Sequence, residues 1–253
     1  MPLVREAISS ACTNRDPFHL DIGEFRSLPF ETFKRLQERA FELARPAIEE
    51  SFRTGCTHVA VAGGEVVQRQ ADPGGFAPEQ IESLIEEHGK PVYAFSRPDL
   101  VEESKWTHVG GTDYYPTVRL WVGHTEWTDS KVFKEGKSLD VDFDTGNPDM
   151  TVFDEEGLSG VFKTPPVYAY EMGVHLEKAY HYFSERARLG LKDGHDNLRV
   201  ITSDIRLVHD WRISPWVLAS PLRSGFVGRH LIFGASFRAI LDPSARQTEL
   251  ELL

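Results

Sequence analysis

The sequence predicts an α+β protein in two parts: an N-terminal helix plus a small ββαβ unit, followed by a mainly β part. Three observations support this fold class. Residues 30–52 carry apolar side chains at helical spacing, residues 57–95 contain short apolar runs separated by turn signals, and most later segments alternate apolar and polar residues. We therefore expect two domains, residues 1–110 and residues 111–253.

The first domain is expected to begin with an amphipathic helix over residues 30–52, which Pro46 ends or kinks. The apolar stripe of this helix consists of Phe33, Leu36, Ala40 and Leu43. The following ββαβ unit comprises a hairpin of residues 57–62 and 65–70, a helix at 78–88 and a strand at 91–95. Residues 96–115 contain proline, glycine and several charges, and are predicted to be a linker.

The second domain contains several predicted strands. Residues 116–122 and 131–143 form the first two, with Gly136 as a turn element, and residues 204–211 alternate again. The final segment, residues 220–242, is predicted to contain a turn and a long apolar run. In residues 168–188 the spacing of Leu176, Ala179, Tyr180 and Phe183 instead indicates a helical insertion.

A D-T-G triplet, formed by Asp144, Thr145 and Gly146, follows the second of these strands. In residues 139–144 three apolar side chains alternate with three aspartates, which places the aspartates on one face of the strand. Gly146 permits a sharp turn, so Asp144 is presented at the strand end, where reactive groups are often displayed. For the triplet alone, the alternative is a loop aspartate that caps a turn.

The triplet and the later F-V-G-R motif at residues 226–229 give an order of features that resembles the retropepsin family of aspartic proteases, over residues 115–243. The resemblance implies a closed β-barrel with Asp144 as the catalytic aspartate. It also implies that Thr145 and Gly146 support the paired aspartates, and that Gly228 and Arg229 are structural residues that help to anchor a dimer. Because the chain has a single D-T-G, the implied enzyme is a homodimer that cleaves a protein or peptide.

The sequence departs from the family pattern at several positions. Asn147 follows the triplet where alanine or serine is usual, and Asp142 replaces an apolar residue of the substrate pocket, so both are candidate pocket residues. Asp142 either lies on a solvated strand face or adds a third carboxylate, which would raise the pKa of the aspartate pair or favour a basic substrate side chain. The flap of the family is expected at residues 157–160 or 164–173.

Residues 59–67, V-A-V-A-G-G-E-V-V, and the predicted helix after them are similar to a small uncharacterised domain that accompanies retropepsin-like domains in some prokaryotic proteins. A phosphate cradle at Gly63-Gly64 is the alternative to a hairpin turn at that dipeptide. The resemblance therefore extends, at the level of domain organisation, to the N-terminal part of the chain.

Composition excludes several other classes of protein. A net charge of −11 argues against a nucleic-acid partner, and the chain contains no apolar run of membrane-spanning length. Two cysteines, Cys12 and Cys56, do not indicate a disulfide framework, so a cytoplasmic location is expected. We expect no metal and no cofactor, because the six-residue spacing of His175 and His181 does not place them on one helix face.

These observations together predict a cytoplasmic, homodimeric aspartic endopeptidase that activates a water molecule between two copies of Asp144. The alternative is a catalytically inactive retropepsin-fold module for dimerisation or peptide binding. The two hypotheses differ in whether two Asp144 carboxylates meet across a dimer axis.

Overall fold

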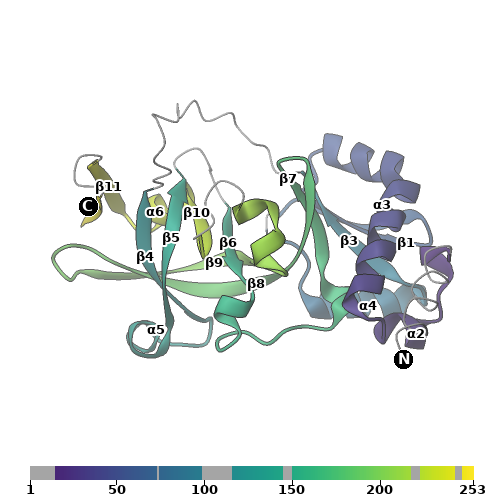
Figure 1. Ribbon diagram of the computed structural model, residues 1–253, viewed down its shortest axis with the longest axis horizontal. Helices are drawn as coiled ribbons and strands as arrows, with labels where there is room; N and C mark the ends of the chain where they lie inside the picture. Colours follow the sequence, from purple (N-terminus) through teal and green to yellow (C-terminus); the bar gives the residue numbers. More distant parts are fainter. Residues whose placement is uncertain (1–14, 73, 99–115, 145–149, 218–222, 243–246) are drawn as a thin grey trace. The chain divides into compact units, whose positions relative to one another are not determined.

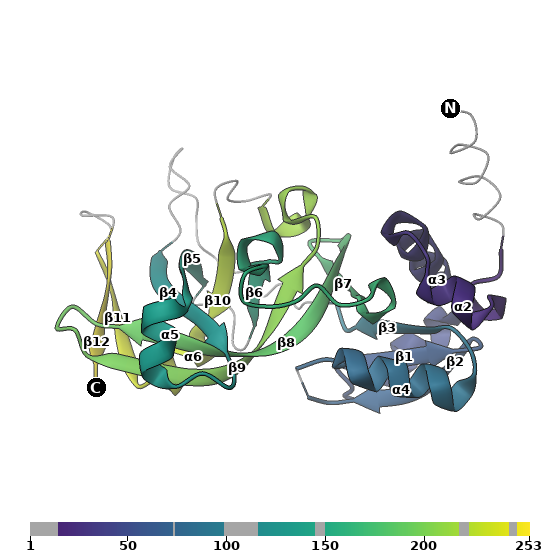
Figure 2. The ribbon, with the colours of Figure 1, turned by 90° about the horizontal axis from the view of Figure 1, so that it is seen from below.

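A computed structural model describes residues 15–72, 74–98, 116–144, 150–217, 223–242 and 247–253. The chain has two compact units, drawn in Figures 1 and 2. Unit 1 comprises Met1–Asp99, Pro165–Val174 and His181–Phe183, and unit 2 comprises Leu100–Thr164, His175–Tyr180 and Ser184–Leu253. Both units combine helices and strands, which agrees with the predicted α+β class.

Unit 1 contains a small sheet with one long and two shorter α-helices. Its elements are η1 (Pro17–His19), α2 (Ile22–Arg26), α3 (Phe30–Arg53), β1 (His58–Ala62), β2 (Glu65–Gln70), α4 (Pro78–His88), β3 (Val92–Ser96), η3 (Val167–Ala169) and most of β7 (Glu171–His175). All five residues of β1 and of β3 are buried, because α3 and α4 lie on opposite sides of the strands (Figure 2). The predicted ββαβ unit is confirmed as β1, β2, α4 and β3.

The turn between β1 and β2 is the predicted two-residue hairpin turn. Gly63 and Gly64 have φ angles of 60° and 84°, which favour glycine at both positions. The strands pair in antiparallel register, with Ala62 opposite Glu65. The phosphate-cradle alternative is not needed to explain these two glycines.

Helix α3 differs from the prediction at Pro46 and at Leu43. The helix continues through Pro46 to Arg53, and Pro46 is exposed, so the carbonyl that the proline leaves without a donor is on the water side of the helix. Leu43 is 55% exposed, and the buried stripe continues through Ala44 and Ile48 instead. Ala44 and Ile48 follow the buried Ala40 by four and eight residues, so the 3.6-residue period of the helix places all three on one face.

Unit 2 is built around a closed barrel of six strands in the order β8-β4-β5-β10-β6-β9, which β8–β9 pairing closes. Its elements are β4 (Thr117–His124), α5 (Asp129–Glu135), β5 (Lys137–Asp144), β6 (Thr151–Asp154), η2 (Glu156–Leu158), most of β8 (Lys178–Lys192), β9 (Leu198–Val208), η4 (Trp211–Ile213), η5 (Pro215–Val217), β10 (Gly225–Gly228), α6 (Arg229–Gly234), β11 (Phe237–Asp242) and β12 (Gln247–Leu252). Strands β11 and β12 form a separate antiparallel pair. The closed barrel that the resemblance implies is therefore present.

The segment predicted as one strand at residues 131–143 contains a helix and then a strand. The Thr128 side chain accepts a hydrogen bond from the backbone N–H of Lys131, so it caps the start of α5. Gly136 ends the helix, and a Cβ atom there would lie 2.2 Å from the carbonyl oxygen of Val132. The helix–strand junction thus requires glycine at position 136.

The predicted helical insertion at residues 168–188 is wrong, because this segment forms the hairpin of β7 and β8. Leu176 and Glu177 make its turn, with positive φ angles of 47° and 61°. The buried positions of β8 occur in runs rather than in strict alternation, and this obscures the strand period. The long β8 strand then continues into the barrel, where its later residues pair with β4.

Candidate functional site

The three aspartates of β5 have three different environments. The Asp140 side chain is exposed. It accepts two hydrogen bonds from the Arg119 guanidinium, one from Nε and one from Nη2, both at 2.8 Å. The Arg119 hydrogen bonds hold the pKa of the Asp140 carboxyl below its usual value. This bidentate pair is a surface ion pair and is not part of the candidate site.

Asp142 is buried and paired with Arg223, from the segment before β10. The Arg223 Nε donates to Asp142 Oδ2 at 2.7 Å, and the two residues are 7% and 5% exposed. Nη1 of the same guanidinium donates to the Trp216 carbonyl oxygen at 2.8 Å, and the group lies over the Phe226 ring. The solvated-face interpretation of Asp142 is therefore wrong. Its charge is compensated by Arg223, which removes the expected attraction for a basic substrate side chain.

Asp144 ends β5 beside β10. The two strands run parallel, and Asp144 is opposite Gly228, whose backbone N–H donates to Met150 at 2.9 Å. Arg229 follows as the first residue of α6 and is half-buried. Thr145, Gly146 and Asn147 lie outside the described residues. The structure thus brings Asp144, Gly228 and Arg229 to the same end of two neighbouring strands.

His175 is the last residue of β7. Its imidazole stacks on the indole of Trp216, with 4.0 Å between ring centroids and 6° between planes. Tyr180, from the start of β8, makes an edge contact with the same indole at 5.4 Å and accepts a 2.7 Å hydrogen bond from Arg206. The hairpin turn therefore places aromatic side chains over Trp216, which is itself 1% exposed.

The electrostatic environment connects His175 to Asp144. Burial lowers the pKa of His175 to about 4, and the positive charges of Arg223 and Arg206 act in the same direction. The carboxylate of Asp144 partly opposes them and favours the protonated ring. His175 is therefore a neutral imidazole at pH 7, within electrostatic reach of the candidate catalytic carboxylate.

His230, in α6, links that helix to two strands of the barrel. Its Nε2 lies 3.1 Å from the Thr151 hydroxyl and 3.4 Å from the Ser203 hydroxyl. Thr151 begins β6 and Ser203 lies in β9, so these contacts help to fix α6 next to the end of β10. Both hydroxyls are distant from His230 in the sequence, so no local pattern predicts these contacts.

Sequence reasoning did not select His175, Trp216 or Arg223 as site residues. The turn after His175 has no glycine, and Trp216 and Arg223 follow no periodic pattern that points to β5. The one available signal was the departure at Asp142: an acidic residue at a position expected to be buried requires a cationic partner.

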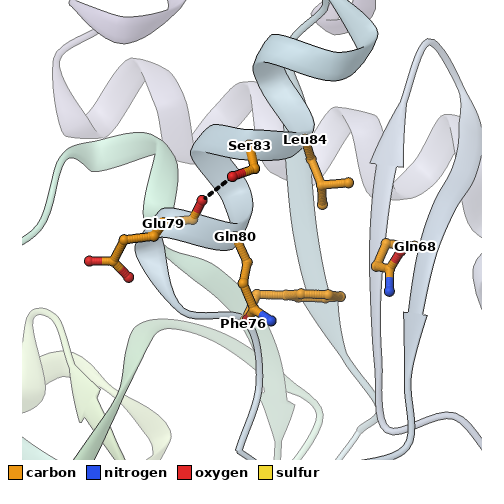
Figure 3. Close-up of a pocket in the computed structure, with 6 residues that line it drawn as sticks. All are labelled: Gln68, Phe76, Glu79, Gln80, Ser83 and Leu84. Atoms are coloured by element: carbon orange, nitrogen blue, oxygen red, sulfur yellow. Dashed lines mark hydrogen bonds between the residues drawn. The ribbon is translucent and has the colours of Figure 1, made fainter.

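A hollow lies in unit 1 between α4 and β2, with a volume of about 320 Å³ (Figure 3). It is lined by Gln68, Phe76, Glu79, Gln80, Ser83 and Leu84. The Ser83 hydroxyl donates to the Glu79 backbone carbonyl, so this hydroxyl is engaged within the helix. Glu79 alone among the lining side chains is ionisable, and the hollow therefore contains no acid–base pair.

Within the described ranges, no group of three or more His, Cys, Asp or Glu side chains is arranged to hold a metal ion. His181 packs against the Phe30 ring at 5.9 Å, while His175 packs on Trp216. None of the described helices is long and apolar enough to cross a membrane. A scan against protein-family models found no match, and searches of curated proteins and of solved structures found none either.

Proposed function

We propose that unit 2 is a retropepsin-like aspartic endopeptidase that acts as a homodimer, with Asp144 contributed by each copy. One observation carries the proposal: Asp144 ends β5 opposite Gly228 of the parallel strand β10, and Arg229 follows as the first residue of α6. The motif order of the resemblance has counterparts in β5, the β7–β8 hairpin, β9, β10, α6 and β11. A closed barrel of six strands supports the same assignment.

The proposed chemistry requires two copies of the chain. Two neighbouring carboxylates cannot both ionise easily, so they share one proton and titrate as a pair. One carboxylate takes a proton from a water molecule, and the other donates a hydrogen bond to the scissile carbonyl oxygen. Each chain carries one D-T-G triplet, so a single copy supplies only half of this pair.

The direct test is digestion of a diverse peptide library at several pH values between 4 and 7.5, with product ends identified by mass spectrometry. Asp144→Asn keeps the size of the side chain but removes the carboxylate, and we expect cleavage to fall by about a hundredfold or more. Sedimentation velocity on the same samples should give dimers under the conditions of cleavage.

Asp140→Asn is a matched control, because Asp140 lies on the same strand and is bound to Arg119 at the surface. We expect this variant to cleave as the wild type does. Cleavage that survives in Asp144→Asn, or that comes from monomers, would contradict the proposal. Dimers that bind peptides without cleaving any of them would favour the inactive peptide-binding module.

A further inference from the structure

We propose that the indole of Trp216 is a substrate subsite for a planar side chain, and that His175 occupies this subsite in the substrate-free protein. The inference deepens the proposed peptidase function and rests on it. The ligand class is an aromatic side chain of a peptide.

The ring geometry supports the choice of ligand. His175 lies flat on the indole, whereas Tyr180 and Phe226 contact the same indole at interplanar angles of 87° and 51°. A flat face that accepts one planar ring at 4.0 Å can accept another of similar size. Of the three neighbours, only His175 directly precedes a hairpin turn, so it can leave without unfolding a barrel strand.

The N–H group of Trp216 is a second, independent indication of a ligand. Trp216 is 1% exposed, and its Nε1 has no hydrogen-bond acceptor in the described part of the chain. Trp211 provides a contrast, because its Nε1 donates to the Arg223 carbonyl oxygen at 2.7 Å. A buried donor without an acceptor is costly. The backbone carbonyl of a bound peptide would supply the acceptor that Trp216 lacks.

The turn that carries His175 favours release. Leu176 and Glu177 both adopt the left-handed region with φ angles of 47° and 61°, although neither is glycine. This conformation is unfavourable for side chains other than those of glycine, asparagine and aspartate, so contacts elsewhere must stabilise it. The His175–Trp216 stack is such a contact, and a competing aromatic ring would remove it.

The charges around His175 give the subsite a pH dependence. Arg223 and Arg206 disfavour the protonated form of the His175 ring, while Asp144 favours it. The carboxylate of Asp142 is already paired with Arg223. Protonation of His175 near pH 4, next to two guanidinium groups, weakens its stack on Trp216. The subsite therefore becomes easier to occupy as the pH approaches 4.

A binding experiment tests the subsite without requiring cleavage. The probe is N-acetyl-phenylalaninamide, followed through the assigned indole N–H resonance of Trp216 in the full-length protein. We expect His175→Ala to bind the probe about three- to tenfold more tightly than the wild type, because the competing ring has been removed. N-acetyl-leucinamide should show no such gain, and His175→Phe should bind the probe no more tightly than the wild type.

Leu176→Ala is the matched control, because Leu176 lies in the same turn and is 43% exposed. A gain of equal size in this variant would show general loosening of the turn and would overturn the inference. Equal affinity of His175→Ala and the wild type would overturn it as well. Failure of the proposed function is a separate result: binding with the expected pattern but without cleavage keeps the subsite and rejects the peptidase.

Discussion

Each unit buries a pair of ionisable side chains, but the two pairs differ in how they are bonded. In unit 2, Arg223 and Asp142 share a 2.7 Å hydrogen bond, and the guanidinium also donates to a carbonyl oxygen. In unit 1, His58 and Glu171 are both 0% exposed, but their nearest nitrogen and oxygen atoms, Nε2 and Oε2, are 3.9 Å apart.

The difference follows from the chemistry of the two cations. Arginine stays charged throughout the normal pH range, so burial of Arg223 requires a carboxylate partner. Histidine can be buried as a neutral ring. The Nδ1 of His58 lies 3.0 Å from the Thr57 hydroxyl and 3.1 Å from the Asp72 carbonyl oxygen, and a neutral ring can satisfy these contacts. Charge compensation is therefore obligatory in unit 2 and optional in unit 1.

The largest effect is expected for Arg223→Met. This change leaves the buried Asp142 without its cation and should lower the free energy of unfolding by about 3–5 kcal/mol. Urea denaturation at pH 7 measures the loss. The double variant Arg223→Met with Asp142→Leu should recover most of the stability, because no buried charge remains. A double variant as unstable as the single one would contradict the charge explanation.

A smaller effect is expected for Glu171→Leu in unit 1. The carboxylate accepts a hydrogen bond from the buried N–H of Phe76 at 3.3 Å, and its removal should cost about 1–3 kcal/mol. Glu171→Gln retains an oxygen acceptor for this N–H and should cost less. Equal losses in the two variants, measured by urea denaturation, would show that the negative charge of Glu171 is itself required.

The sequence predicted those parts of the fold that depend on local signals. The glycine pair of the β1–β2 turn and the bounds of α4 agree with the structure because each depends on a few adjacent residues. The β7–β8 hairpin was missed because its turn uses Leu176 and Glu177 in place of glycine. Local patterns thus predicted elements well where the turn chemistry was ordinary.

The candidate site was only partly predictable for a different reason. Asp144 and Gly228 belong to recognisable motifs, and the structure places them opposite each other on parallel strands. Arg223 and Asp142 are 81 residues apart, and His175 reaches the same region from a third segment. Side-chain pairing over such separations depends on the register of the barrel strands, which no periodicity in a single segment specifies.

The pH dependence of stability should distinguish His175 from the buried pairs. The pKa of His175 is about 4 in the folded protein and 6.5 in an unfolded chain. Above pH 6.5 both states are neutral, so His175 has no effect. Between pH 6.5 and 4 the unfolded state binds the proton more readily, and the free energy of unfolding decreases as the pH falls.

His175→Phe removes this titration but keeps a planar ring. We expect the wild type to lose stability relative to His175→Phe as the pH falls from 6.5 to 4, with no further change below pH 4. Urea denaturation at intervals of one pH unit measures this difference. A constant difference between the two proteins across the range would mean that His175 is not buried as a neutral ring.

The smallest effect is expected at the exposed pair of Arg119 and Asp140, which shares β5 with the buried pair. Arg119→Ala should change the free energy of unfolding very little, although its hydrogen bonds to Asp140, at 2.8 Å, are about as short as those of Arg223, because water solvates the remaining charge after the change. The loss should shrink further in high salt. A salt-independent loss as large as that of Arg223→Met would mean that hydrogen-bond geometry, and not burial, sets the energetic importance of the aspartates on this strand.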